Sequence, residues 1–160
     1  MMYAMTVLCV KDLEKSKKFY YDLFGLTVEE DFGTYVSVTK GLAFQLVDSW
    51  QDYLGKREPE IVYKNHASKV VFEIDNFDEV LHIITTRNDI ELVHPIIHYS
   101  WRRRVVRFYD PDGHIVEVGE SMDIVVKRFI SSGLTAEEAA NRIETSVDSV
   151  NDSLERSNNN

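Results

Sequence analysis

Histidines are the first residues to test for metal chemistry, because imidazole is the commonest transition-metal ligand in proteins. The chain has five: His66, His82, His94, His98 and His114. Two histidines four residues apart bind zinc when they share a helix face. His94 and His98 have this spacing, but Pro95 and the β-branched residues nearby favour a strand or loop. A metal site combining one of them with Glu117 stays open, although solvated or hydrogen-bonded histidines are the default expectation.

The cysteine count and the charge exclude several functional classes. A single cysteine, Cys9, excludes an internal disulfide and a cysteine-rich zinc site. It lies in an apolar run, which favours an inert core residue over a nucleophile. We expect a reducing, cytoplasmic environment. The net charge of −9 should repel nucleic acid and anionic membranes, and no apolar run has the length of a membrane helix.

One basic cluster interrupts this acidic chain and consists of Arg102, Arg103, Arg104 and Arg107. The segment is predicted to be a strand, on which Arg102 and Arg104 share one face while Arg103 points to the other. The cluster is therefore divided between two faces, which argues against nucleic-acid binding.

The first half of the chain predicts a strand, a helix and three further strands. Residues 3–10 are apolar and β-branched, which predicts a buried strand. Asp12 can cap a helix that ends at Gly25. The helix places Leu13, Ser16, Tyr20 and Leu23 on one face. Short strands are predicted at residues 27–31, 35–39 and 42–47. Residues 49–67 are polar and are predicted to be a linker.

The same order of elements then recurs. Residues 69–74 predict a strand, and Asn76 with Glu79 has the spacing of a capping box for the next helix. Strands are predicted at residues 91–97, 103–109 and 114–119. The segment Val10–Glu14 aligns with Ile74–Asp78, and Gly41–Gln45 aligns with Gly113–Glu117. A duplicated βαβββ module explains this recurrence, with two curled sheets whose concave faces form a cleft.

The alignment also pairs strand residues between the two halves. Met5 corresponds to Lys69, and Gln45 corresponds to Glu117. If one of these four side chains faces the cleft, we expect the others to face it too.

Two segments resemble a known superfamily. Val10–Tyr20 is similar to the opening strand and helix of vicinal oxygen chelate modules, which include glyoxalases, bleomycin resistance proteins and dioxygenases. Phe108–Val118 is similar to their closing turn and last strand, and its Asp-Pro-Asp-Gly turn is the more specific signal. The resemblance covers Tyr3–Glu120. It implies an α+β fold of two tandem βαβββ modules, residues 1–48 and 68–120, within a domain of residues 1–120.

The resemblance also implies where a metal would bind. Metal-dependent members take His, Glu or Gln ligands from the first and last strand of each module, which correspond here to Met5, Gln45, Lys69 and Glu117. Glu117 matches and Gln45 is acceptable. A thioether and an ammonium are poor ligands for hard divalent cations. We therefore expect no cofactor and no bound metal, although a divalent metal is not excluded.

A lysine at a metal-ligand position suggests an electrostatic replacement. We predict an ion pair between Lys69 and Glu117, with Gln45 hydrogen-bonded nearby. The alternative is that Lys69 extends to solvent from the end of its strand.

Other residues are candidates for a ligand pocket. Trp101 and Arg104 fall where similar proteins carry an aromatic residue and an arginine near the pocket. Arg104 would bind a ligand carboxylate or phosphate, or would simply cover an aromatic ring at the surface. Aromatic side chains that could line the pocket, or belong to the core, are Tyr35, Phe44 and Trp50. His114 is expected to point outward.

Residues 121–156 predict helices beyond the duplicated domain. Helices are expected at residues 123–132, from Thr135 through Glu144 with a capping box, and from Ser146. This is the outline of a helix-turn-helix, but the last helix is acidic, so packing on the body or on a partner subunit is preferred to DNA binding. Residues 157–160 are predicted to be a disordered tail.

The preferred function is a glyoxalase/bleomycin-resistance-like protein that binds a small organic molecule without the usual divalent metal. The first alternative is a glyoxalase-type lyase or isomerase with Glu117 as base and Lys69 as electrophile. The second is a transcriptional regulator acting through the C-terminal helices. Many similar proteins pair their chains, so a homodimer is expected, with no nucleic-acid or membrane partner.

Overall fold

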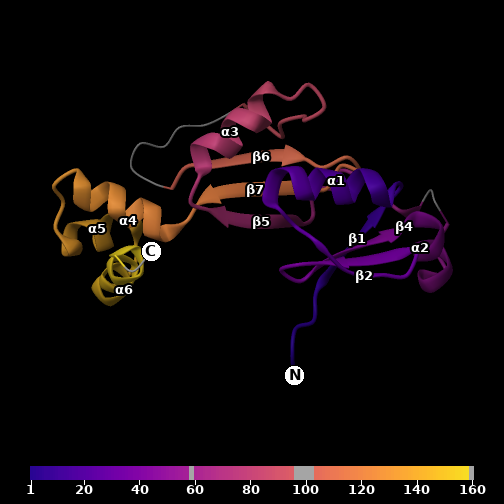
Figure 1. Cartoon of the computed structure of the whole chain (residues 1–160), viewed down its shortest axis with the longest axis horizontal. Coiled ribbons are helices and arrows are strands. Elements are labelled where there is room, and N and C mark those ends of the chain that lie inside the picture. The colour runs from indigo at the N-terminus through magenta and orange to yellow at the C-terminus, as the bar shows by residue number, and fades with distance from the viewer. Residues whose placement is uncertain (58–59, 96–102, 159–160) are drawn as a thin grey trace. The chain divides into compact units, whose positions relative to one another are not determined.

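The computed structural model describes residues 1–57, 60–95 and 103–158. The chain divides into two compact units (Figure 1). The first unit contains Met1–Val70, Arg87–Glu91 and Tyr109–Ile115, and the second contains Val71–Thr86, Leu92–Phe108 and Val116–Asn160. Each unit is built around its own sheet.

The first sheet has the strand order β1-β4-β3-β2. Its strands are β1 (Thr6–Val10), β2 (Val28–Asp31), β3 (Tyr35–Val38) and β4 (Leu42–Leu46). β1 runs parallel to β4, whereas β3 is antiparallel to both β2 and β4. Because side chains alternate along a strand, the paired residues Tyr35 and Gln45 lie on one face, and Val36 and Phe44 lie on the other.

Helix α1 (Leu13–Phe24) covers the apolar face of this sheet. The Asp12 side chain accepts a hydrogen bond from the backbone N–H of Lys15, and Gly25 ends the helix in a left-handed conformation, as the sequence predicts. Tyr20 is fully buried, and its ring lies 5.0 Å from that of Phe44. Phe44 is therefore a core residue and does not line a pocket.

Helix α2 (Val47–Leu54) occupies the start of the segment predicted to be a linker, so that prediction was wrong for residues 49–54. The helix has no side-chain N-cap. Its polar residues Asp48, Gln51 and Asp52 lie between its apolar residues, so the helical spacing of the apolar residues was not recognised. It follows β4 directly and ends at Gly55 in a left-handed conformation. Its apolar residues Val47, Trp50 and Leu54 have helical spacing, and the helix contacts β1 and β4.

The second sheet has the strand order β5-β7-β6, with β5 (Lys69–Ile74), β6 (Val105–Tyr109) and β7 (Ile115–Glu120). Buried residues of α3 (Phe77–Thr86) and alternate residues of β6 and β7 form its core, which contains Phe77, Val80, Ile84, Val106, Phe108, Val116 and Val118. The strand expected at residues 91–97 is reduced to a bridge between Leu92 and Phe108 among the described residues. Residues 96 and 97 lie outside them.

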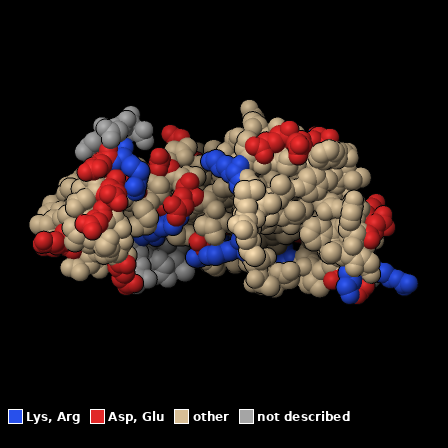
Figure 2. Space-filling model, turned by 90° about the horizontal axis from the view of Figure 1, so that it is seen from below, with Lys and Arg blue, Asp and Glu red and all other residues tan. Residues whose placement is uncertain are grey.

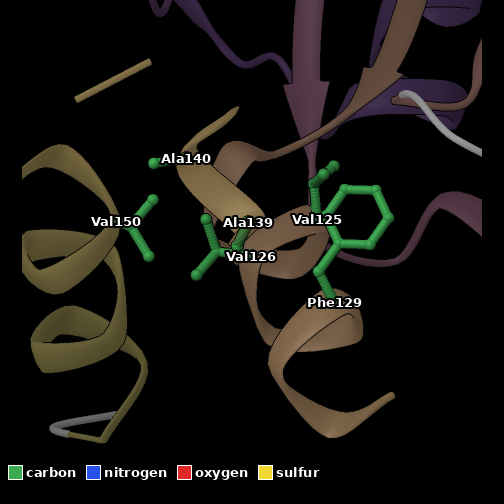
Figure 3. Packing of buried hydrophobic residues seen from close by; sticks show 6 residues of the cluster. All are labelled: Val125, Val126, Phe129, Ala139, Ala140 and Val150. Carbon is green, nitrogen blue, oxygen red and sulfur yellow. The ribbon is translucent and has the colours of Figure 1, made fainter. Parts of the chain in front are cut away.

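Three helices complete the second unit: α4 (Met122–Ser131), α5 (Ala136–Ile143) and α6 (Val147–Asn158). All three confirm the sequence prediction, including the capping box of Thr135 and Glu138. Their shared core contains Val125, Val126, Phe129, Ala139, Ala140 and Val150 (Figure 3). The helices pack on one another, and α6 extends through the first two residues of the predicted tail; residues 159 and 160 are outside the described range.

The observed elements confirm an α+β fold with two sheets and C-terminal helices. In the described part of the chain, no helix has the length and apolar character needed to cross a membrane.

Candidate functional site

Two residues predicted to bind a ligand meet on the face of the first sheet opposite α1. Tyr35 and Gln45 are cross-strand neighbours. The Tyr35 hydroxyl donates a hydrogen bond to the Met5 sulfur, and the Gln45 amide donates one to the Ser49 hydroxyl at 2.9 Å. Three of the predicted site residues, Met5, Tyr35 and Gln45, are thereby brought together by β3, β4 and the residue that precedes β1.

These side chains border a hollow of about 650 Å³. We call it the aromatic hollow; it is lined by Phe32, Thr34, Tyr35, Gln45, Ser49 and Tyr53. Phe32 and Tyr53 are largely exposed, at 67% and 82% of their surface. The Phe32 and Tyr35 rings lie 6.3 Å apart. Phe32 and Tyr53 were not predicted from the sequence, although exposed aromatic rings beside a polar pair are a recognisable sign of a binding surface.

Glu117 lies in β7 and is only 8% exposed. Its carboxylate accepts a hydrogen bond from Arg107 Nε at 2.6 Å. Arg107 also lies 3.4 Å from Nε2 of His94. The cation that pairs with Glu117 is therefore an arginine on the neighbouring strand β6. The sequence analysis missed this pair because it considered only the family's ligand positions. The pairing of Glu117 with Lys69, an exposed residue at the start of β5, stays a prediction.

Arg104 is bound to carboxylates of its own unit. It donates to Glu120 through Nε at 2.8 Å and to Asp78 through Nη1 at 2.7 Å. Its guanidinium also lies 5.0 Å from the Phe77 ring centroid. Asp78 raises the pKa of Arg104, and Arg104 in turn lowers the pKa of Asp78. These contacts favour a structural role over the predicted ligand-binding role.

Arg103 and Arg104 precede β6, which begins at Val105 rather than at the predicted residue 103, and the two side chains have different partners. Arg103 pairs with Glu73 at 2.7 Å, whereas Arg104 pairs with Glu120. Trp101 and Arg102 lie outside the described residues. On the molecular face in Figure 2, basic and acidic side chains are interspersed, which gives no broad cationic surface there.

The Asp-Pro-Asp-Gly turn holds α1 through Asp110. The Asp110 carboxylate accepts hydrogen bonds from the Tyr20 hydroxyl at 3.0 Å, from the backbone N–H groups of Asp112 and His114, and from His114 Nδ1 at 2.9 Å. Burial and the adjacent Asp110 charge raise the pKa of Tyr20 well above its usual range. His114 therefore does not simply point outward, as the sequence suggested; it is tied to the buried carboxylate.

Asp112 gives a pH-dependent prediction. Burial raises its pKa above the ordinary value, partly opposed by a hydrogen bond from the Lys11 backbone. A raised folded-state pKa means that this group contributes stability below its unfolded pKa, and that the contribution is lost as pH rises through the folded value. We expect Asp112→Asn, which keeps an acceptor oxygen, to stabilise the protein at neutral pH relative to wild type.

The advantage should shrink below about pH 4, where the wild-type carboxyl is protonated in both states. Urea unfolding at several pH values measures this difference. An advantage that is constant across the range would contradict the assignment, and Asp48→Asn on an exposed part of α2 is the control.

The donor set at the family's ligand positions does not fit a divalent metal. Met5 offers a thioether that already accepts from Tyr35, and Lys69 offers an ammonium. Glu117 is paired with Arg107. Among the described residues, no three His, Cys, Asp or Glu side chains form a group that could hold a metal ion. His94 contacts Arg107 and the Pro95 carbonyl, and His98 is outside the described range.

A sequence comparison decides the family. The sequence model of the glyoxalase-like domain matches residues 3–123. The chain belongs to the glyoxalase-like domain family. This assignment confirms the resemblance carried by the α1 region and the Asp-Pro-Asp-Gly turn, and it leaves α4–α6 almost entirely outside the matched segment.

Solved structures resemble this glyoxalase-like protein in fold. A protein of unknown function from Agrobacterium tumefaciens is 34% identical with a TM-score of 0.65, over 76% of this chain and 95% of that one. A glyoxalase/bleomycin resistance protein/dioxygenase family enzyme from Burkholderia phytofirmans is 11% identical, with a TM-score of 0.62 over 74% and 97%. The fosfomycin resistance protein FosX from Mesorhizobium loti is 18% identical, with a TM-score of 0.53 over 81% and 99%.

No curated protein matches the glyoxalase-like chain significantly. None of the three structural relatives is described as a transcriptional regulator.

Proposed function

We propose that this glyoxalase-like protein binds a small organic molecule in the aromatic hollow and does so without a divalent metal. The observation that carries the proposal is the position of Gln45 and Tyr35. They border a hollow with exposed aromatic rings. Met5, at a family ligand position, accepts a hydrogen bond from Tyr35 through its sulfur, which is therefore less available to a metal. Aromatic walls with a few polar groups favour a planar, partly apolar ligand.

A fluorescent dye tests the hollow before the natural ligand is identified. We expect anilinonaphthalene sulfonate to bind the folded protein, and Tyr53→Ser to weaken binding about tenfold by removing an exposed ring from the wall. Tyr21→Ser is the control, since Tyr21 is also exposed, at 60%, but lies on α1. Equal dye affinity in both variants would contradict the assignment of the hollow.

Metal independence has a separate test. Elemental analysis of the purified native protein should find no stoichiometric zinc, nickel, manganese or iron, and adding these ions should leave the dye affinity unchanged. Tight stoichiometric metal that Glu117→Gln removes would overturn this part of the proposal.

A lyase or isomerase is the second candidate, favoured by the buried Glu117 carboxylate beside the Arg107 cation. In this role Glu117 would accept a substrate proton, and Lys69 or Arg107 would stabilise the resulting negative charge. Turnover of thiohemiacetals that is abolished by Glu117→Gln would support it. For either candidate we expect a cytoplasmic homodimer, which light scattering and cell fractionation would check.

A further inference from the structure

A second cavity in the first unit contains residues that the proposed function does not use. It has a volume of about 270 Å³ and lies beside β1, α2 and the segment that includes Tyr63 and His66. Six residues of its wall matter here, and we call the space the histidine cavity: Cys9, Trp50, Tyr63, His66, His114 and Ile115. Helix α2 contributes Trp50 and Leu54 to this cavity but Ser49 and Tyr53 to the aromatic hollow, so the two spaces use different positions of one helix.

His114 is oriented in the cavity wall by Asp110. Its Nδ1 lies 2.9 Å from the buried Asp110 carboxylate. Because a carboxylate can only accept, Nδ1 carries the proton, and the neutral ring keeps a lone pair on Nε2. Nε2 lies on the other side of the ring from Asp110 and has no hydrogen-bond partner among the described residues. An aspartate–histidine pair of this kind holds an imidazole ready to accept a proton and stabilises the imidazolium that results.

The other residues of the cavity wall determine which ligands can reach Nε2 of His114. The Tyr63 ring packs edge-on against His114, with the ring centroids 6.5 Å apart, and the Lys11 ammonium lies 4.4 Å from the Tyr63 centroid. The Tyr63 hydroxyl lies 3.7 Å from the Cys9 sulfur. Burial raises the pKa of Cys9, so its thiol is largely neutral and is expected to react slowly with alkylating reagents. Trp50 and Ile115 add apolar surface, and the wall also contains the charged residues Lys56, Glu60 and Lys64.

We propose that the histidine cavity is a second ligand site, which binds a small aromatic molecule with a weakly acidic hydroxyl group, a phenol. The ring lies against Trp50 and Tyr63, and the hydroxyl donates to His114 Nε2. On binding, the phenolic O–H bond breaks and the proton passes to Nε2. The products are a phenolate and an imidazolium whose charge is balanced by Asp110.

The probe is para-nitrophenol, whose phenolate absorbs visible light. At about pH 6.5 we expect wild-type protein to raise the phenolate absorbance of the added probe and to shift the NMR signals of the His114 ring. His114→Gln keeps a polar side chain beside Asp110 but cannot take the proton, and should weaken binding at least about tenfold. The control is His82→Gln, at an exposed position of α3.

Two further measurements separate this site from the aromatic hollow. The sole cysteine, Cys9, reports occupancy, so para-nitrophenol should slow its alkylation by iodoacetamide in the wild type. Tyr53→Ser, which lies in the aromatic hollow, should leave both readouts unchanged. The proposal is overturned if the probe does not bind, if Cys9 is not protected, or if Tyr53→Ser rather than His114→Gln abolishes binding. Should His114→Gln fail to fold, Cys9 protection and the His114 signals of wild-type protein decide.

Discussion

Replacing Glu120 with alanine is expected to lower the free energy of unfolding by roughly 3–5 kcal/mol, because the ion-pair network that it forms with Arg104 and Arg128 loses its buried anion. Glu120 is fully buried in β7. It accepts hydrogen bonds from the backbone and Nε of Arg104 and from Nη1 of Arg128 on α4. The substitution removes the buried carboxylate that both guanidinium groups share, whereas Arg104 keeps its exposed partner Asp78. Urea unfolding at neutral pH measures the loss.

Asp78→Ala is the matched control for this prediction. Asp78 pairs with the same Arg104 at 2.7 Å, but its side chain is 76% exposed, so we expect a loss below about 1 kcal/mol. Hydrogen exchange adds a second readout, since Arg128 connects α4 to Glu120 and amides of α4 should exchange faster in Glu120→Ala. Equal, small losses in both variants would show that burial does not govern the strength of this network.

Replacing Asp110 with alanine should cost about 3 kcal/mol or more, because its carboxylate accepts four hydrogen bonds and is inaccessible to water. Removal leaves the buried Tyr20 hydroxyl without its acceptor and releases the turn that carries His114. The same change should also abolish para-nitrophenol ionisation in the histidine cavity, since the imidazole loses its orienting partner.

Tyr20→Phe separates the two roles of Asp110. It deletes one hydrogen bond while keeping the ring packed against Phe44, so a loss of about 1–2 kcal/mol is expected. The contact between Asp110 and His114 is unchanged in this variant, and probe ionisation should survive. Loss of ionisation in Tyr20→Phe, or a stable Asp110→Ala protein, would contradict the anchoring role of Asp110.

Local signals made several elements of this protein predictable from sequence. The cap of α1 at Asp12 and its end at Gly25 depend on residues within one helical turn, and so does the capping box of Thr135 and Glu138. The Asp-Pro-Asp-Gly turn is equally local, and its strand-flanked context was enough to indicate the family. The match over residues 3–123 confirms that inference.

The partners of charged and polar side chains depended on tertiary structure. Strand register decides them, because a shift of one residue moves a side chain to the opposite face of a sheet. Arg107 of β6 meets Glu117 of the neighbouring strand β7, whereas Arg104, which precedes β6, meets Glu120 of β7 and Asp78 of α3. Helix α2 was missed because its three apolar positions lie in a mostly polar segment and no side chain caps its start.

The amino-acid sequence by itself determined the family and the order of most elements. Only the tertiary structure decided that Asp110 accepts a hydrogen bond from Tyr20, which is 90 residues away along the chain. The same carboxylate also contacts Nδ1 of His114. Backbone conformation depends mainly on residues a few positions away in the sequence. Burial and ion pairing instead depend on which distant segments pack around a side chain and exclude water from it.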